Sequence, residues 1–219
     1  MYAMTRNQIT HHLTDALLMA YSAGSLPEAF NLTVATHLSM CDECRARAAA
    51  FDAVGGAMME ETQTAEMAQD SLAATMALIR AGKPQREAPA QRTGIFPAPL
   101  RDYVGGDLAA VRWRPVGMGV KQAILPTSRA ATARLLYIPA GAAVPDHGHR
   151  GTELTLVLQG AFCDQVARFG PGDIEVANED LDHTPVAEIG ADCICLAATD
   201  APLRFRALMP RIAQPFLRI

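Results

Sequence analysis

Two histidines and a glutamate in the second half of the chain have the spacing of a metal site. His147 and His149 lie two residues apart in the stretch PDHGHRGTELTLVLQG, and Glu153 follows four residues after the second histidine. Side chains at i and i+2 of an extended segment point to the same face, so the two imidazoles converge. In the alternating run that follows, Glu153 and Thr155 share one face of a predicted strand. That face brings the carboxylate beside both histidines.

A third histidine completes this candidate site. The sequence FGPGD, residues 169–173, predicts a tight turn between strands, and His183 is the histidine that follows it. The candidate ligands are then His147, His149, Glu153 and His183. A set of three imidazoles and one carboxylate suits zinc, iron, manganese or nickel, so the ligands do not identify the metal.

A cluster with softer ligands lies in the first half of the chain. HLSMCDEC has the order H-x3-C-x2-C and contains three ligand-type residues: His37, Cys41 and Cys44. On one continuous helix all three share a face. If the helix instead breaks near Met40, the two cysteines at the start of the next helix still converge on one ion. Thiolate and imidazole are ligands that zinc prefers, and a closed zinc site has four of them.

The residues leave the fourth zinc ligand open between His11 and His12, which both precede the first predicted helix. A Cys2His2 site there would join the first helix to the second and third helices and stabilise a domain with a small core. The CxxC pair also has a redox interpretation, but the βαβ context typical of thioredoxin-like motifs is missing. Five cysteines and a reducing compartment favour a metal or redox site over a structural disulfide.

Helices are expected to position the first cluster. Apolar residues recur at helical spacing within residues 10–82. Gly24 and Gly82 are helix stops, Pro27 suits a first helical turn, and the pair at 55–56 weakens or ends the third helix. We therefore expect about four short helices, near residues 13–21, 28–38, 42–61 and 67–80.

The second half is predicted to be a β domain. Residues 83–100 hold four prolines and almost no periodicity, which predicts a linker and argues against communication by rigid packing. From Arg101 onward, short runs rich in Val, Ile, Leu and Thr are separated by Gly, Pro and Asp, as in an antiparallel β sandwich or barrel. The expected strands are VRWRPV, VKQAIL, ARLLYIP, ELTLVLQG, DIEVAN and CICLAA.

Length and charge exclude some functions. The 219 residues suffice for two small domains. Residues 1–82 carry four basic and nine acidic side chains, a net charge of −5, which argues against nucleic-acid binding and suits a basic protein partner. No apolar run approaches the ~18 residues of a membrane span, and the N-terminus lacks the apolar core of a signal peptide. We therefore expect a cytoplasmic protein that binds neither nucleic acid nor membrane.

Both clusters resemble motifs of known families. The H-x3-C-x2-C motif in a small helical segment, residues 7–82, resembles the zinc-binding anti-sigma domain, and this resemblance favours His12 as the fourth ligand. The spacing G-x5-H-x-H-x3-E-x6-G, which begins at Gly141, matches the first cupin motif. His183 lies further past the PGD turn than in the compact second cupin motif.

The combination resembles the ChrR-type anti-sigma factors. The resemblance implies an α + β protein of two domains: a helical zinc-binding bundle (1–82), a Pro-rich linker (83–100) and an all-β cupin, an antiparallel jelly-roll barrel or double-stranded β-helix (101–219). It implies Zn²⁺ in the first cluster and Zn²⁺ or another divalent transition metal in the second. It also implies a regulator, not an enzyme. Such a protein forms a one-to-one complex with an extracytoplasmic-function sigma factor, keeps it from core RNA polymerase, and releases it on singlet-oxygen-type stress sensed through the cupin.

Two other classes are alternatives. A metal-dependent cupin enzyme, an oxygenase or isomerase with an accessory helical domain, would keep an open metal position for substrate. A DNA-binding repressor would need a basic recognition helix, which the acidic first part lacks. Cys193 and Cys195 are expected in the core, with a redox role as the alternative. Arg134 is expected in the scaffold, with an inward orientation toward an anionic ligand as the alternative.

Overall fold

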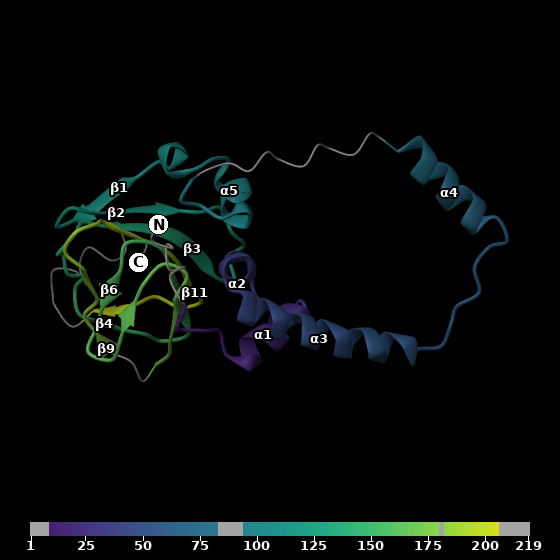
Figure 1. Cartoon of the computed structure of the whole chain (residues 1–219), viewed down its shortest axis with the longest axis horizontal. Helices are drawn as coiled ribbons and strands as arrows, with labels where there is room; N and C mark the ends of the chain where they lie inside the picture. Colours follow the sequence, from purple (N-terminus) through teal and green to yellow (C-terminus); the bar gives the residue numbers. More distant parts are fainter. Residues whose placement is uncertain (1–8, 83–93, 180–181, 206–219) are drawn as a thin grey trace, which may run out of the picture.

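The computed structural model describes residues 9–82, 94–179 and 182–205. A helical first part packs against an antiparallel β barrel, and the outer end of one helix and the helix after it extend away from this body (Figure 1). The expected α + β fold is confirmed. The sequence expectations for residues 83–93 and for the C-terminal tail concern segments outside the described ranges.

Residues 9–82 contain four helices, as predicted: α1 (Asp15–Ser22), α2 (Glu28–Met40), α3 (Asp42–Glu60) and α4 (Ser71–Ala81). Thr14 caps α1 by accepting a hydrogen bond from the N–H of Leu17. The third helix does not end at Gly55 and Gly56, one of the two outcomes expected there, because α3 continues through both. Each glycine costs a helix only ~1 kcal/mol relative to alanine, too little to end one of this length.

A short helix, α5 (Ala98–Val104), begins inside the predicted linker and is followed by a 3-10 turn, η1 (Leu108–Ala110). Phe96 and Leu100 are buried in the core there. The boundaries of the domains remain a prediction, but the C-terminal end of the predicted linker is packed in the core. Within the described ranges, no helix has the length and apolar character that crossing a membrane requires.

The main sheet has six antiparallel strands in the order β1-β2-β3-β11-β5-β8. They coincide with the six predicted runs: β1 (Arg114–Gly117), β2 (Val120–Ile124), β3 (Thr132–Ile138), β5 (Glu153–Gln159), β8 (Ile174–Ala177) and β11 (Cys193–Thr199). Two three-stranded sheets, β10-β6-β7 and β12-β4-β9, close the barrel. Their strands are β4 (His147–Gly148), β6 (Phe162–Cys163), β7 (Arg168–Phe169), β9 (Asp182–His183), β10 (Val186–Ala187) and β12 (Arg204–Phe205).

Alternation along the strands divides the barrel's side chains between two cores. On β5, Leu154 and Leu156 face outward and Val157 faces inward. The outward residues join one continuous core with Phe30 and Val34 of α2, which packs across β3, β5 and β11. The two parts of the chain are therefore in direct contact, which differs from the expectation that the linker argues against communication by rigid packing.

Candidate metal centres

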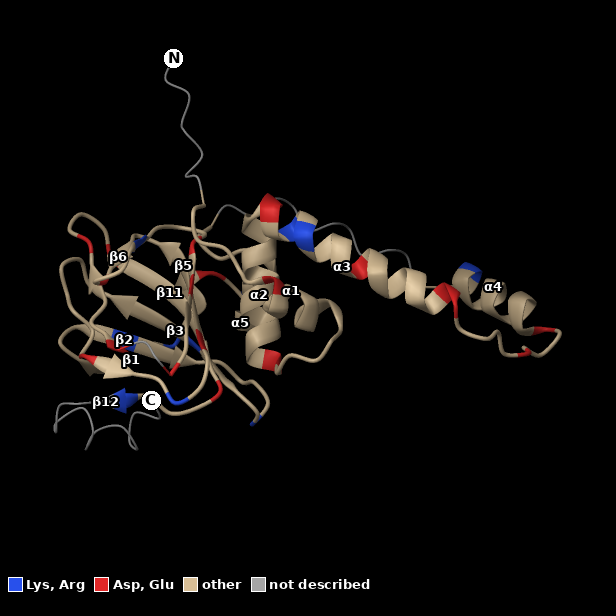
Figure 2. Cartoon of the chain, turned by 90° about the horizontal axis from the view of Figure 1, so that it is seen from below, with Lys and Arg blue, Asp and Glu red and all other residues tan. Residues whose placement is uncertain are grey.

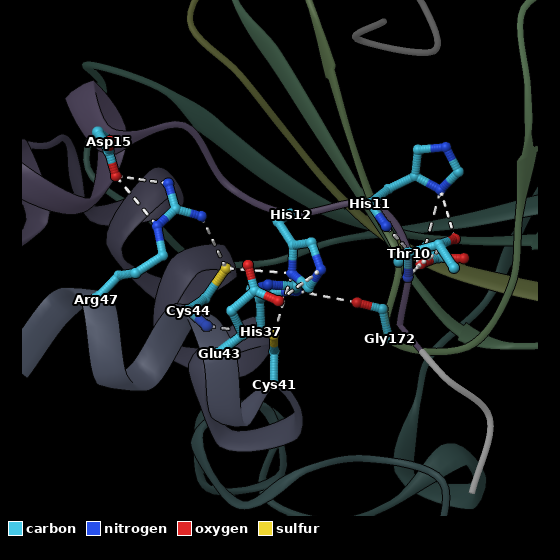
Figure 3. Close-up of polar contacts among 11 residues, drawn as sticks. Thr10, His11, His12, Asp15, His37, Cys41, Glu43, Cys44, Arg47 and Gly172 are labelled. Atoms are coloured by element: carbon cyan, nitrogen blue, oxygen red, sulfur yellow. Dashed lines mark hydrogen bonds and ion pairs between the residues drawn. The ribbon is translucent and has the colours of Figure 1, made fainter. Parts of the chain in front are cut away.

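The first cluster forms where the segment before α1 meets the junction of α2 and α3 (Figure 3). Of the two geometries considered, the structure has the one with a break: α2 ends at Met40, and Cys41 is extended, with φ −110° and ψ 108°. The Cys41 sulfur then accepts a hydrogen bond from the N–H of Cys44, at 3.4 Å, and caps α3. Four donor atoms lie within 4.8 Å of one another, from His12, His37, Cys41 and Cys44.

The donor atoms in this cluster fit a zinc ion. His12 Nδ1 lies 3.3 Å from the sulfur of Cys41 and 3.6 Å from that of Cys44. Donors that share one zinc, with bonds of about 2.0–2.3 Å, are separated by such distances. On His37, Nδ1 is 3.0 Å from the carbonyl oxygen of Gly172, whereas Nε2 is buried without a hydrogen-bond partner. A metal ion would satisfy that nitrogen while Nδ1–H donates to the carbonyl.

His11 lies apart from this cluster. Its ring packs against Phe169 of the barrel, with centroids 4.3 Å apart, and its Nδ1 is 3.7 Å from Oδ1 of Asp173. Figure 3 shows His11 turned away from the cysteines and His12 turned toward them. Of the two candidates, the structure places His12 at the cluster; its role as ligand remains a prediction.

Burial disfavours the charged forms of two groups in the first cluster, His37 and Cys44. It lowers the pKa of His37 to about 4, so the imidazole carries no proton that a metal would have to displace near neutral pH. Burial, reinforced by the neighbouring Cys41, raises the pKa of Cys44 to about 11. Metal binding at this cluster must therefore release the thiol proton of Cys44, which makes metal binding weaker in acid.

The second cluster is built by two short strands. β4 and β9 pair antiparallel, with His147 directly opposite His183. His149 follows β4, and its Nε2 lies 3.4 Å from Nε2 of His183. All three histidines are buried, and one donor nitrogen of each lies within 4.8 Å of the others. The spacing and the turn have thus brought together histidines that are 34 residues apart.

Hydrogen bonds orient two of these rings. His147 Nδ1 is 2.8 Å from the carbonyl oxygen of Pro145. His183 Nδ1 is 3.1 Å from Oε1 of Glu175 and 3.3 Å from Oδ2 of Asp164. An imidazole that donates from Nδ1 presents Nε2 as a lone pair, which is the usual arrangement of metal-binding histidines. The donor set therefore fits a divalent transition metal.

Carboxylates surround the second cluster. Oε2 of Glu153 is 3.7 Å from Nδ1 of His149, and the hydroxyl of Thr155 donates to Oε1 at 3.0 Å. Glu153 is beside the histidines, as predicted, but is not in the set whose donors all lie within 4.8 Å. Sequence reasoning missed Asp164 and Glu175, which form a further group with His183. Glu175 lies within a short apolar strand, and the sequence alone does not indicate whether such a glutamate faces the interior of the barrel or the solvent.

Three thiols lie elsewhere in the barrel. Cys193 and Cys195 are fully buried on β11 as free thiols, and their sulfurs are hydrogen-bonded at 3.5 Å. The hydrogen bond between them and burial both raise the pKa of Cys195. Cys163 is partly exposed, and its sulfur is 3.5 Å from Oε1 of Glu188.

The chain is similar to known proteins over nearly its whole length. Residues 102–201 match the ChrR cupin-like domain family. The chain is 65% identical over 212 residues to the anti-sigma-E factor ChrR of Cereibacter sphaeroides, covering 96% of this chain and 99% of that protein. It also resembles a chain in the crystal structure of Rhodobacter sphaeroides SigE in complex with the anti-sigma ChrR, with a TM-score of 0.77 and 63% identity, covering 88% of this chain and 100% of that one. Identity at this level and coverage places the chain in the family of the anti-sigma-E factor ChrR.

Proposed function

We propose that this protein is an anti-sigma factor, a regulator rather than an enzyme. The observation that carries the proposal is the 65% identity to an anti-sigma factor across 96% of the chain. Its partner would be a sigma factor of the extracytoplasmic-function class, bound one to one and so kept from core RNA polymerase. Because sigma factors and polymerase act in the cytoplasm, we place the protein there.

An apolar helical surface supports the binding of a partner. The eleven-residue α4 has no buried residue, although helices this short are marginal without packing. Figure 2 shows that it is almost free of charged side chains, apart from Arg80. In α4, at the end of α3 and in the segment between them, six apolar side chains are exposed by 66% or more: Met58, Met59, Met67, Leu72, Leu78 and Ile79. An exposed patch of this kind marks a protein interface.

Zinc in the first cluster would be structural. His12, His37, Cys41 and Cys44 would hold it and so fix the segment before α1 to the α2–α3 junction, which orients the partner-binding helices. In the second cluster, zinc or another divalent transition metal would be held by His147, His149 and His183, with Glu153 moving in to complete the set. A metal there would supply a centre at which an oxidant can change the ligands.

The contact between the two parts supports a sensing role for the barrel. Glu175 holds His183 and lies three residues after Gly172, whose carbonyl oxygen binds His37 of the first cluster. A rearrangement at the second cluster would therefore reach the zinc site through the turn before β8. A signal acts only if the bound and released states differ in free energy at this contact. We propose that oxidative, singlet-oxygen-type stress favours the released state.

The proposal is tested by isolating the full chain with an affinity tag from its native host and identifying co-purifying proteins by mass spectrometry. We expect a small sigma factor in about one-to-one amount, lost in the double variant Cys41→Ala, Cys44→Ala. Cys163→Ala, which changes a partly exposed thiol outside both clusters, is the matched control. Absence of a sigma factor from the wild-type sample would contradict the proposal.

The sensing step needs a separate test. The purified complex is illuminated with a photosensitiser, and the fraction of free sigma factor is measured by gel filtration. We expect release from the wild-type complex and retention in the complex that carries His147→Ala. Equal release from both would show that the second cluster does not sense the oxidant.

A further inference from the structure

The barrel encloses a cavity of about 510 Å³ next to the second cluster. This volume is within the range of small-molecule sites. His147, His183 and Glu153 are among the residues that line it. The rest of the wall is mainly apolar, and six of its residues are Val116, Val120, Leu136, Ile138, Val144 and Phe162. A ligand that fits this space has a large apolar body.

A buried arginine lies in the wall of this cavity. On β3, alternate side chains face opposite ways: Leu135 joins the core under α2, whereas Arg134 and Leu136 line the cavity. Arg134 is only 6% exposed. Its Nη1 donates one long hydrogen bond to Oε1 of Gln122, at 3.4 Å, and its Nε is buried with no partner.

The charge of this arginine is poorly compensated. A guanidinium keeps its proton even when buried, and an unpaired buried charge is costly. Arg134 forms no ion pair with any carboxylate of the described residues, although the charge of Glu153 acts on it from further away. The other carboxylate in the wall, Glu175, is hydrogen-bonded to His183. A divalent metal held by Glu153 and neutral histidines would make the charge in the wall of the cavity still more positive.

We propose that the cavity binds an apolar monocarboxylate, with its carboxylate on Nε and a terminal nitrogen of Arg134. A guanidinium recognises a carboxylate through two parallel hydrogen bonds, which would pair the orphaned Nε. The hydrocarbon body lies against Leu136, Ile138 and Phe162. A phosphate fits less well, because its second charge would face apolar side chains. This site extends the proposed function and does not depend on the binding of a sigma factor.

The test is isothermal titration of octanoate into the full-length, metal-loaded protein. Octanamide, which has nearly the same shape and no charge, is the control ligand. We expect octanoate to bind and Arg134→Gln to weaken the binding at least tenfold. Arg129→Gln, at an exposed position, should leave the affinity unchanged.

A second variant separates ligand binding from folding. Leu136→Trp fills the cavity and leaves Arg134 in place, so it should also abolish binding. Metal content and melting temperature are measured for each variant. Loss of binding in variants that keep their metal supports the site. Absence of octanoate binding to the wild type, equal affinity for octanamide, or binding by Arg134→Gln or Leu136→Trp within threefold of the wild type would each overturn it.

Discussion

At the scale of single residues, His11 and His12 are neighbours on an extended segment, yet their imidazoles contact different groups. Successive side chains of an extended chain point to opposite sides. His12 therefore faces the two sulfurs, whereas His11 faces Asp173 and Phe169 of the barrel. The sequence narrowed the choice to this pair through ligand type and location. Only the docking of the segment on the barrel decides which imidazole reaches the cluster.

We expect His12→Ala to remove ~1 equivalent of zinc per chain, because a structural site with three ligands binds far more weakly than one with four. His11→Ala is the matched control and should keep its zinc. Metal content of the full-length protein, measured by plasma mass spectrometry, distinguishes the two. The opposite pattern would make His11 the ligand.

Asp173 joins the N-terminal segment to the barrel and should make stability depend on pH. Burial raises its pKa, but hydrogen bonds from the N–H groups of Gly170, Thr10 and His11 outweigh burial, and the pKa is lowered. A lowered pKa in the folded state contributes stability above the unfolded value of about 3.9, and the contribution is lost as pH falls through the folded value.

Asp173→Asn should therefore lower the free energy of unfolding by about 1–3 kcal/mol at pH 7, since it weakens hydrogen bonds to a charged group. The difference from the wild type should shrink below about pH 3.9. Urea unfolding of both proteins at pH 7 and pH 3.5 measures it. A difference that stays constant over this range would show that the charge of Asp173 is not involved.

At the scale of elements, the turn before β8 is one of the contacts between the helices that carry the first cluster and the barrel. Gly172 has φ +92°, and a Cβ there would lie 2.6 Å from Cδ1 of Ile9. Its carbonyl oxygen also binds His37. The turn therefore depends on glycine for two reasons, its backbone conformation and the close approach of the N-terminal segment.

Gly172→Ala should destabilise the protein by ~1–3 kcal/mol through backbone strain, and by about 1 kcal/mol more through the clash with Ile9. Gly190→Ala is the control, because Gly190 has φ +122° and no atom near the added Cβ. Thermal unfolding gives the melting temperature of both variants, and the difference between them reports the contact with Ile9. Equal melting temperatures would mean that the N-terminal segment moves away from the added Cβ without loss of stability.

Local patterns in the sequence predicted the elements better than their contacts. Alternation and turn residues identified the six strands of the main sheet, because both signals depend on neighbours in sequence. The docking of α2 was missed, although Glu28–Met40 has eight buried positions and one acidic residue. A helix that is apolar on most sides is buried on most sides, and this signal was available. The contacts of Asp164 and Glu175 with His183 depend on how short strands close the barrel, which spacing does not specify.

At the scale of the whole molecule, the protein divides into a packed body and an exposed helical arm. α2 is buried between the other helices and the sheet, whereas α4 has no buried residue. Stability and partner binding should therefore be separable by mutation.

Leu78→Asp with Ile79→Asp should change the melting temperature by no more than about 1–2 °C, because both side chains are exposed by 66% or more. The same change should weaken binding of the sigma factor at least tenfold, since it places charges in an apolar interface. Thr75→Asp adds a charge to the same helix at a polar position and serves as the control. Surface plasmon resonance gives the affinities, and an unaffected affinity would exclude α4 from the interface.

The core shared by α2 and the main sheet has a consequence for how the chain is destroyed. A protease that cuts between Gly82 and Gly94 breaks the covalent connection but leaves the apolar contacts of Phe30 and Val34 with Leu154 and Leu156 intact. The two fragments would stay together as a nicked, non-covalent heterodimer that still holds its partner. Cleavage alone would then leave the partner bound. Degradation of the regulator would depend on an unfoldase that pulls the two fragments apart.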